Sequence, residues 1–388
     1  MTSPALSGGI ASHLHPGASY DVAHHPTPSG REEVWRFTPL KRLRGLLEGS
    51  PSADDLDWDV QAPDGVRISR ISTADAIDLG GPAPVDRLAA LSVANSGGAV
   101  RLHVPDGTEL DAPVRIRLRG ATPEQLVWDH LVVTIGRSAQ ATVVLEYEGS
   151  ATYSAMVQVL VGDGAQLQLA RLQLWDDDAV HTGHVGLRIG RDARVRTFSA
   201  SLGGDLVRLV ETTEYDGPGG QLEQLGLYFA DAGQHLEHRL FVDHNAPHTR
   251  SNVDYRGALQ GLGAHTVWIG DVVIRKVAEG IETYESNRNL VLTDGCRADS
   301  VPNLEIETGE IIGAGHASTT GRFDDLQLFY LQSRGIPVDE ARRLVVHGFF
   351  ADIVRRLGVP EIETRLMAAV EDELVRSVGL PPASAVGA

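Results

Sequence analysis

The sequence has 388 residues, of which 42% are apolar, and it carries a formal net charge of −18. A chain of this length and composition buries a large core, as two or three domains or as one long solenoid. The negative charge, with no run rich in Lys and Arg, argues against binding of nucleic acid or of an anionic membrane surface.

No segment reaches the roughly 18 uncharged apolar residues of a membrane span, and the N-terminus lacks the basic and apolar parts of a secretion signal. We therefore expect a cytoplasmic protein. Cys296 is the single cysteine, which excludes an internal disulfide. One thiol cannot build a thiolate-rich zinc or iron-sulfur site without ligands from another chain.

The N-terminal part is predicted to be an arm followed by a short helix. Residues 1–30 are rich in Ala, Gly, Ser, Pro and His without a periodic pattern, which predicts a flexible arm. From Glu32 to Glu48, Trp35 and several leucines recur at three- and four-residue intervals, as in an amphipathic helix. Residues 31–65 thus form an N-terminal helical segment and a Pro- and Asp-rich linker.

Residues 66–322 form the predicted core. Strand-like segments each follow a glycine-containing turn: Val143–Tyr147, Gln166–Leu169 and Arg194–Phe198. The turns recur at intervals of 26, 28 and 27 residues and then at three times 26, beginning at Gly136, Gly162, Gly190, Gly217 and Gly295. This repeat predicts a mainly β fold with a right-handed parallel β-helix core between small N-terminal and C-terminal helical regions. An antiparallel sandwich is the alternative.

Residues 323–388 form the predicted C-terminal helical domain. Three segments place apolar residues at helical intervals, and Asp324, Asp339 and Pro360 lie near their starts. We expect these helices to cap the last coil, because an open sheet edge otherwise pairs with other strands.

Few residues have the pattern of a catalytic site. The aspartates at 176–178 read as a solvated loop, and the pair His235 and His238 would point to opposite faces of a strand. His265 and His347 lie among apolar residues and are interpreted as packing residues. Phosphate-loop and nucleophile-elbow motifs are missing, so we predict that the chain is not an enzyme. A carbohydrate-active β-helix enzyme, which would need paired carboxylates on one coil face, is the less favoured reading.

His316 has a different setting from the other histidines. It lies in GEIIGAGHASTTGR, where small residues let a partner chain or an ion approach closely. From this pattern alone, the imidazole either ligates a metal or simply hydrogen-bonds the backbone.

The stretch from Tyr284 to Phe350 contains SNRNL, NLEI and QLFYL in this order and resembles the C-terminal half of the SufB/SufD family of iron-sulfur cluster assembly proteins. EVWRFTPL near the N-terminus is similar to the SufD branch. The resemblance implies a parallel β-helix in a complex of a SufB-like paralogue, a SufD-like chain and two copies of the SufC ATPase. It implies a scaffold that couples ATP hydrolysis by SufC to a cluster-assembly site at the SufB/SufD interface.

Two positions distinguish the branches, and Ala314 and Cys296 are departures from the SufD pattern. Ile306 stands where SufB-type chains carry a functional cysteine, and Ser318 follows His316-Ala317 where those chains have HEA. Ala314 replaces a cysteine that many SufD-type chains have two residues before the histidine. Cys296 matches a SufB-type cysteine and is interpreted as a packing residue.

The resemblance also implies the site residues. His316 is the predicted cofactor-binding and metal-ligating residue, for a transient iron-sulfur cluster at the interface with SufB, with no cofactor bound stably by this chain alone. The C-terminal helices are predicted to dock onto SufC. A homodimeric scaffold without a metal role is the alternative. The predicted partner-binding residues are Asp324, Asp325, Phe329, Tyr330, Arg334, Gly335, Arg342 and Phe349.

Overall fold

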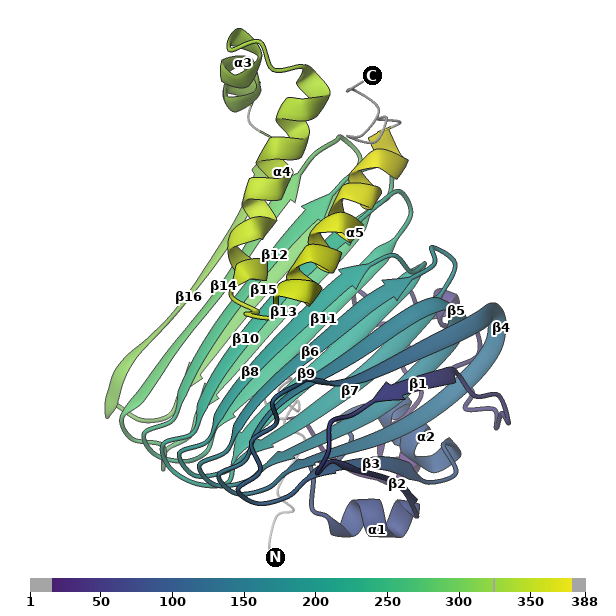
Figure 1. The fold of residues 1–388 in the computed structure, drawn as a ribbon, viewed down its shortest axis with the longest axis vertical. Coiled ribbons are helices and arrows are strands. Elements are labelled where there is room, and N and C mark those ends of the chain that lie inside the picture. Colours follow the sequence, from purple (N-terminus) through teal and green to yellow (C-terminus); the bar gives the residue numbers. More distant parts are fainter. Residues whose placement is uncertain (1–15, 324, 379–388) are drawn as a thin grey trace, which may run out of the picture.

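The computed structural model describes residues 16–323 and 325–378. Its central feature is a parallel β-solenoid of about eight turns, shown in Figure 1. All the strands belong to one 16-stranded sheet that folds over on itself at β5. β4 (Val114–Ile135) and β5 (Gln140–Val161) are long strands that contribute to both halves of the folded sheet.

One half of the folded sheet, the even-strand sheet, contains the first part of β5 and then β6 (Gln166–Trp175), β8 (Arg194–Leu202), β10 (Gln221–Ala230), β12 (Arg250–Leu259), β14 (Ile281–Val291) and β16 (Ile311–Arg322). The other half, the odd-strand sheet, contains the second part of β5 and then β7 (Val180–Ile189), β9 (Leu206–Tyr215), β11 (His235–His244), β13 (His265–Ile274) and β15 (Arg297–Ile306). Neighbouring strands in both are parallel. The β-helix predicted from the repeat is confirmed.

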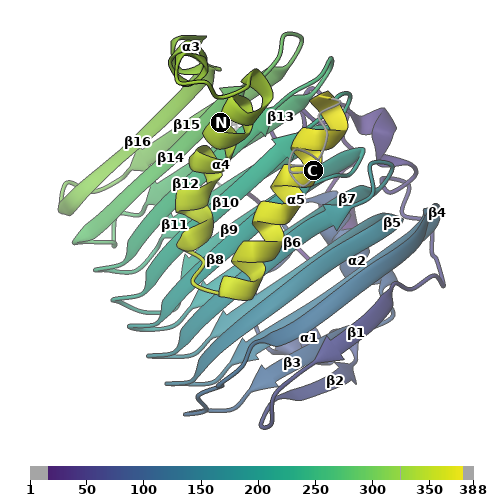
Figure 2. The ribbon, with the colours of Figure 1, turned by 45° about the horizontal axis from the view of Figure 1, so that its top comes forward.

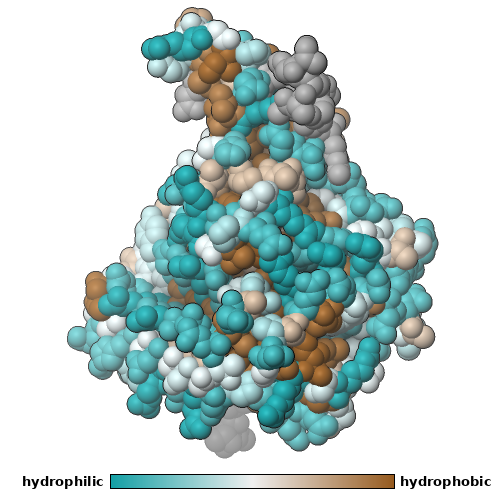
Figure 3. All heavy atoms as spheres, viewed as in Figure 1, coloured by the Kyte–Doolittle hydropathy of each residue, from teal (hydrophilic) through white to brown (hydrophobic). Residues whose placement is uncertain are grey.

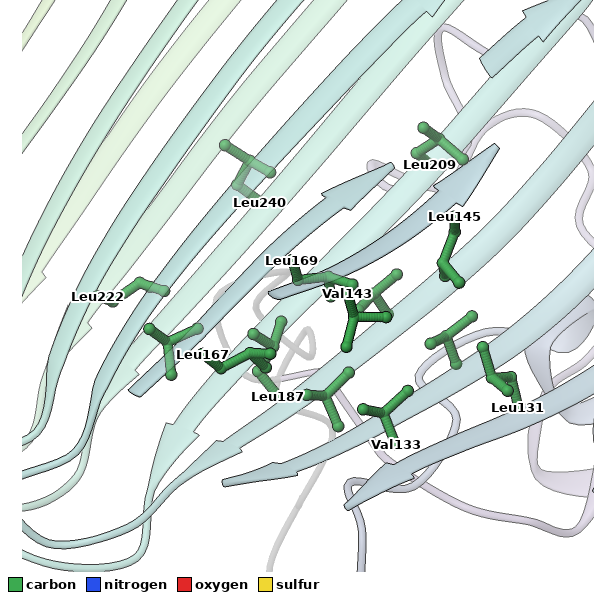
Figure 4. Close-up of a cluster of buried hydrophobic side chains, with 14 of the residues drawn as sticks. Leu131, Val133, Val143, Leu145, Leu167, Leu169, Leu187, Leu209, Leu222 and Leu240 are labelled. Carbon is green, nitrogen blue, oxygen red and sulfur yellow. The ribbon is translucent and has the colours of Figure 1, made fainter. Parts of the chain in front are cut away.

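The two sheets bury alternate side chains between them. In the first coils these side chains are mostly Leu, Val and Ala, and Figure 4 shows Val143, Leu169, Leu187 and Leu209 among those that fill the interior. Each fully buried aliphatic side chain of this kind contributes about 1.5–3 kcal/mol relative to an exposed one. The stacked leucines therefore hold the coils in register.

Four of the predicted turns share one corner of the solenoid, and the fifth does not. Gly136, Gly162, Gly190 and Gly217 each follow a strand of the odd-strand sheet and lead into the even-strand sheet. Gly295 lies between β14 and β15, at the opposite corner, where its carbonyl accepts a hydrogen bond from the Gly263 N–H at 3.0 Å. Including Gly295 in the same series was wrong.

Helices α4 (Val338–Arg355) and α5 (Pro360–Val378) lie across the outer face of the even-strand sheet, as Figures 1 and 2 show. Phe350 packs against Phe229 with ring centroids 6.5 Å apart, in a cluster with further apolar residues of both helices. The three predicted C-terminal helices are confirmed, with α3 (Asp325–Ser333) as the first. The predicted cap is wrong, because the helices cover a face and leave the last coil open.

The N-terminal part covers the outer face of the odd-strand sheet. It contains η1 (Val22–His24), η2 (Leu40–Leu43), β1 (Asp57–Gln61), β2 (Arg67–Ile71), α1 (Thr73–Asp78), α2 (Arg87–Asn95) and β3 (Ala99–Val104). β1 and β3 pair with β4 at this end of the solenoid. The first coil therefore begins later than residue 66, the start of the predicted core of 66–322.

Two N-terminal predictions need correction. The amphipathic helix expected from Glu32 to Glu48 is a series of turns around η2, although Trp35 and Leu46 are buried as expected. Residues 16–30, expected to be part of a flexible arm, contact the solenoid, where the Gln158 side-chain amide on β5 donates a hydrogen bond to the Tyr20 hydroxyl at 2.7 Å. Residues 1–15 of the arm lie outside the described residues. Within the described residues, no helix has the length and apolar character needed to cross a membrane.

Candidate functional site

His316 lies on β16, the last strand of the even-strand sheet, and its side chain is 42% exposed. The register pairs it with Glu285 on β14. The His316 Nδ1 atom is 3.8 Å from Glu285 Oε1, which is too long for a hydrogen bond. The imidazole therefore stands at the open end of the solenoid with one ring nitrogen toward a carboxyl group.

Glu285 is buried, with only 2% of its side chain exposed. Its carboxyl group reaches across the coil to Gly270 on β13, where a Cβ would come within 2.3 Å of Glu285 Oε2. Glu285 Oε1 accepts no hydrogen bond from the residues that the structure describes. Burial, together with the nearby Asp271 carboxylate, raises the pKa of Glu285 to about 8.

The interior of the last coils is polar, whereas the interior of the first coils is apolar. The Asn287 side-chain amide donates to the Tyr228 hydroxyl at 2.8 Å, and the Ser300 hydroxyl donates to Asn287 Oδ1 at 2.8 Å. Asn289 donates to the same Asn287 oxygen at 2.8 Å. These groups satisfy one another, and they place a polar network beside the open end.

Residues 283–289, TYESNRN, contain these polar residues. On β14 the inward positions alternate, and Glu285, Asn287 and Asn289 occupy them. An isolated run of polar residues at alternate positions in a β-helix strand is the signal that could have identified Glu285.

Small residues surround His316 as expected. A Cβ at Gly313 would meet no atom within 4 Å, and one at Gly315 would be 3.4 Å from the Tyr284 ring. Ala314, at the position of the cysteine of other chains, packs against the interior. This part of the β16 strand therefore leaves space for another chain.

The predicted partner-binding residues fall into two groups. Phe329 and Tyr330 are 68% and 57% exposed on α3, which projects from the solenoid, and Figure 3 shows hydrophobic side chains at that end of the molecule. The Arg334 guanidinium lies 5.1 Å from the Tyr330 ring centre, and Gly335 follows with a positive φ of 85°.

The other predicted contact residues are less accessible. Arg342 and Phe349 on α4 are partly buried, and Phe349 packs against Phe350 with ring centroids 5.2 Å apart. Asp325 begins α3. Asp324 lies outside the described residues. The structure thus places the exposed part of the predicted surface on α3.

His235, His238 and His265 have structural partners. His235 and His265 contact each other through their Nδ1 atoms at 3.1 Å, and His265 Nε2 is 2.7 Å from Asp299. His238 stacks on Tyr228 inside the coil, so His235 and His238 do point to opposite faces. His347 is exposed on α4, and the packing role expected for it is wrong. Within residues 16–323 and 325–378, no group of three or more His, Cys, Asp or Glu residues could hold a metal ion.

A groove of about 800 Å³ crosses the outer face of the even-strand sheet and ends at Ala314 and Gly315. Its acidic residues Glu223 and Glu282 face Arg196 and Arg250 at 2.5 and 3.4 Å. Glycosidic hydrolysis uses two carboxyl groups flanking the bond, and these acids are paired with arginines instead. The groove gives no support to the carbohydrate-active reading.

Comparisons with known proteins agree with this architecture. The family model described as SUF system FeS cluster assembly, SufBD core domain, matches residues 118–349. The chain is 49% identical to an iron-sulfur cluster assembly SufBD family protein of Mycobacterium bovis over 385 residues, or 96% of this chain and 97% of that protein. A protein of the same description from Mycobacterium tuberculosis is 48% identical over the same shares of the two chains. The iron-sulfur cluster assembly protein SufD of Bacillus subtilis is 25% identical over 293 residues, covering 74% of this chain and 66% of that protein.

Proposed function

Since the chain belongs to the SufBD family of SUF-system iron-sulfur cluster assembly proteins, we propose that it is a SufD-like scaffold subunit of a complex with a SufB-like paralogue and a SufC-like ATPase. Similarity to the SufD protein of Bacillus subtilis supports the SufD branch. So does Ile306, which stands where the functional cysteine of SufB-type chains is expected. The cytoplasmic location expected from the sequence stays a prediction.

The position of His316 carries the proposal. It is partly exposed on β16, whose outer edge pairs with no described strand. A SufB-like chain docked on this edge would bring its thiolate close to the imidazole. Neutral imidazole and thiolate are both ligands of iron, so the two chains together can hold a nascent cluster that this chain does not hold alone.

The C-terminal helices supply the link to the ATPase. α3 presents exposed aromatic side chains, whereas α4 and α5 are fixed to the even-strand sheet by a buried apolar cluster. A SufC-like ATPase bound to α3 would therefore transmit movement through α4 to the strands that end near His316. In this mechanism ATP hydrolysis opens or closes the interface, and the cluster is cargo.

Co-expression tests the proposal. This chain is tagged and produced with SufB-like and SufC-like partners, and bound iron and sulfide are measured in the purified complex. We expect His316→Ala to lower the cluster content about tenfold or more while the complex still forms. His24→Ala, a change at a histidine that is 70% exposed in the N-terminal part, is the matched control and should leave the cluster content unchanged.

The two other outcomes separate the alternatives. Unchanged cluster content in a complete complex with His316→Ala would leave a scaffold without a metal role. A tagged chain that purifies only with itself would contradict the SufD-like assignment and favour a homodimeric scaffold, for which the open edge of β15 and β16 is the specific observation.

A further inference from the structure

We propose that Glu285 is the positioning residue of His316: an oxygen of its carboxyl group accepts a hydrogen bond from Nδ1–H of the imidazole and leaves Nε2 free to bind iron at the open edge. The inference rests on the proposed function of His316 and adds to it a residue on a different strand. Its basis is the pairing of β14 with β16 and the burial of the carboxyl group.

The structure holds the Glu285 carboxyl group in one place. It extends inward from β14 to the space above Gly270, and a Cβ at this glycine would collide with both Glu285 Oε2 and the Trp268 ring. Trp268 itself is fully buried. A carboxyl group enclosed in this way cannot swing out to solvent, so it presents a fixed acceptor to whatever lies at the open end.

The unused acceptor points to His316. Glu285 Oε1 accepts no hydrogen bond from the described residues, and the His316 Nδ1 atom is 3.8 Å away. Buried polar atoms are normally satisfied, and an unsatisfied one at a functional site calls for an explanation. A movement of the exposed imidazole by about 1 Å would bring the pair to charge-assisted hydrogen-bond distance.

Histidine ligands in metal sites usually donate their second ring N–H to a carboxylate, which fixes the tautomer and raises the basicity of the ligating nitrogen. In this chain the inward nitrogen is Nδ1, so Nε2 is the nitrogen left to ligate iron.

The first measurement uses the isolated full chain with 15N-labelled histidine. Long-range 1H–15N spectra at alkaline pH report the tautomer of His316, with His316→Ala for assignment. We expect Nδ1–H in the wild type and a shift toward Nε2–H in Glu285→Leu. An unchanged tautomer in this variant would overturn the inference.

The second measurement uses the complex with SufB-like and SufC-like partners, loaded at increasing Fe²⁺ concentrations. Glu285→Gln should raise the iron concentration for half-maximal loading about 10–100-fold while the complex still forms. Gly270→Ala, which displaces the carboxyl group without removing it, should act in the same direction. Thr283→Val, a buried change on the same strand, is the control and should load as the wild type does.

The failures can be distinguished. If His316→Ala lowers iron loading and Glu285→Gln does not, the positioning role is overturned and the proposed function stands. If Glu285→Gln abolishes loading while Glu285→Leu leaves the tautomer unchanged, Glu285 is a direct ligand and the positioning role is again overturned. If His316→Ala has no effect on loading, the proposed function itself fails.

Discussion

Asp86 fixes the N-terminal part of the chain to the solenoid. Its Oδ1 accepts a hydrogen bond from the Ala89 N–H at 2.9 Å as the N-cap of α2, and its Oδ2 accepts one from Arg208 on β9 at 2.7 Å. The Arg208 guanidinium also lies 3.9 Å from the centre of the Trp35 ring. The Asp86 carboxylate therefore joins α2 to β9, and the Arg208 side chain that it binds also contacts the N-terminal turns.

The pKa of Asp86 gives this contact a pH dependence. Burial alone would raise it, but the Arg208 guanidinium and the Ala89 N–H hold it below its ordinary value of 3.8. A lowered folded-state pKa contributes stability above the unfolded pKa, and that stability is lost as the pH falls.

We expect Asp86→Asn to destabilise the fold by about 3 kcal/mol at pH 7, because the buried Arg208 guanidinium loses its nearer carboxylate and keeps the more distant Glu237, at 3.5 Å. Urea unfolding of the wild type and the variant should show a difference that shrinks as the pH falls below about 3.8 toward the lowered folded-state pKa of Asp86. Asp294→Asn, which removes an exposed ion pair with Arg322, is the control and should change stability by at most about 1 kcal/mol. A difference that does not vary with pH would contradict the linkage to Asp86.

His316 could be selected from the sequence, and the role of Glu285 could not be, for a physical reason. A histidine flanked by small residues is visible as a local sequence pattern. The role of Glu285 depends on Gly270 in the facing sheet and on the register of β14 against β16, which bring together residues far apart in the chain. Such contacts follow from the stacking of coils and cannot be read from a local window.

At the level of elements, the strands and the turns of one corner were predictable because each coil repeats the same local chemistry. Gly295 was misplaced because both corners use glycine, and an interval of 78 residues does not tell one corner from the other. The segment from Glu32 to Glu48 has helical spacing but contains Pro39 and Gly45, and it buries Trp35 through turns. Here tertiary packing decided the conformation.

α3 is the element whose function is most open to test. Its aromatic residues Phe329 and Tyr330 are exposed and contribute little to the folded chain, so their truncation should alter stability by less than about 0.5 kcal/mol. Exposed aromatic anchors often contribute 2 kcal/mol or more to an interface, as an approximate figure. We expect the double change Phe329→Ala with Tyr330→Ala to weaken binding of a SufC-like ATPase by about 2 kcal/mol or more.

Calorimetric titration of the isolated chain with the ATPase measures this effect. Leu262→Ala, an 80% exposed leucine at a corner of the solenoid, is the matched control for loss of exposed apolar surface. Equal affinity of the double variant and the wild type would exclude α3 as the docking element.

Considered as a whole, the molecule has two different ends. At the N-terminal end β1 and β2 add antiparallel strands, the core is apolar, and helices lie close by. At the C-terminal end β15 and β16 are the last strands of the sheet order, and the interior beside them is polar. Within the described residues, β1 and β2 at the N-terminal end are short, exposed antiparallel strands, whereas the C-terminal end has an open parallel edge beside a polar interior. We expect another chain to continue the solenoid at the C-terminal end.

An open parallel edge presents backbone N–H and C=O groups that another strand can pair with. Ile312 on β16 is 65% exposed beside these groups, and Ile306 ends β15 with an exposed side chain. Without a SufB-like partner, two copies can pair the same edge around a twofold axis.

We expect the isolated chain to form dimers, which sedimentation velocity measures. Ile312→Lys should lower the dimer fraction, since a charge on an edge strand opposes pairing, whereas Leu262→Lys at the corner should not. Because a SufB-like partner would use the same edge, Ile312→Lys should weaken that complex too, and loss of only one of the two assemblies would mean that they use different surfaces.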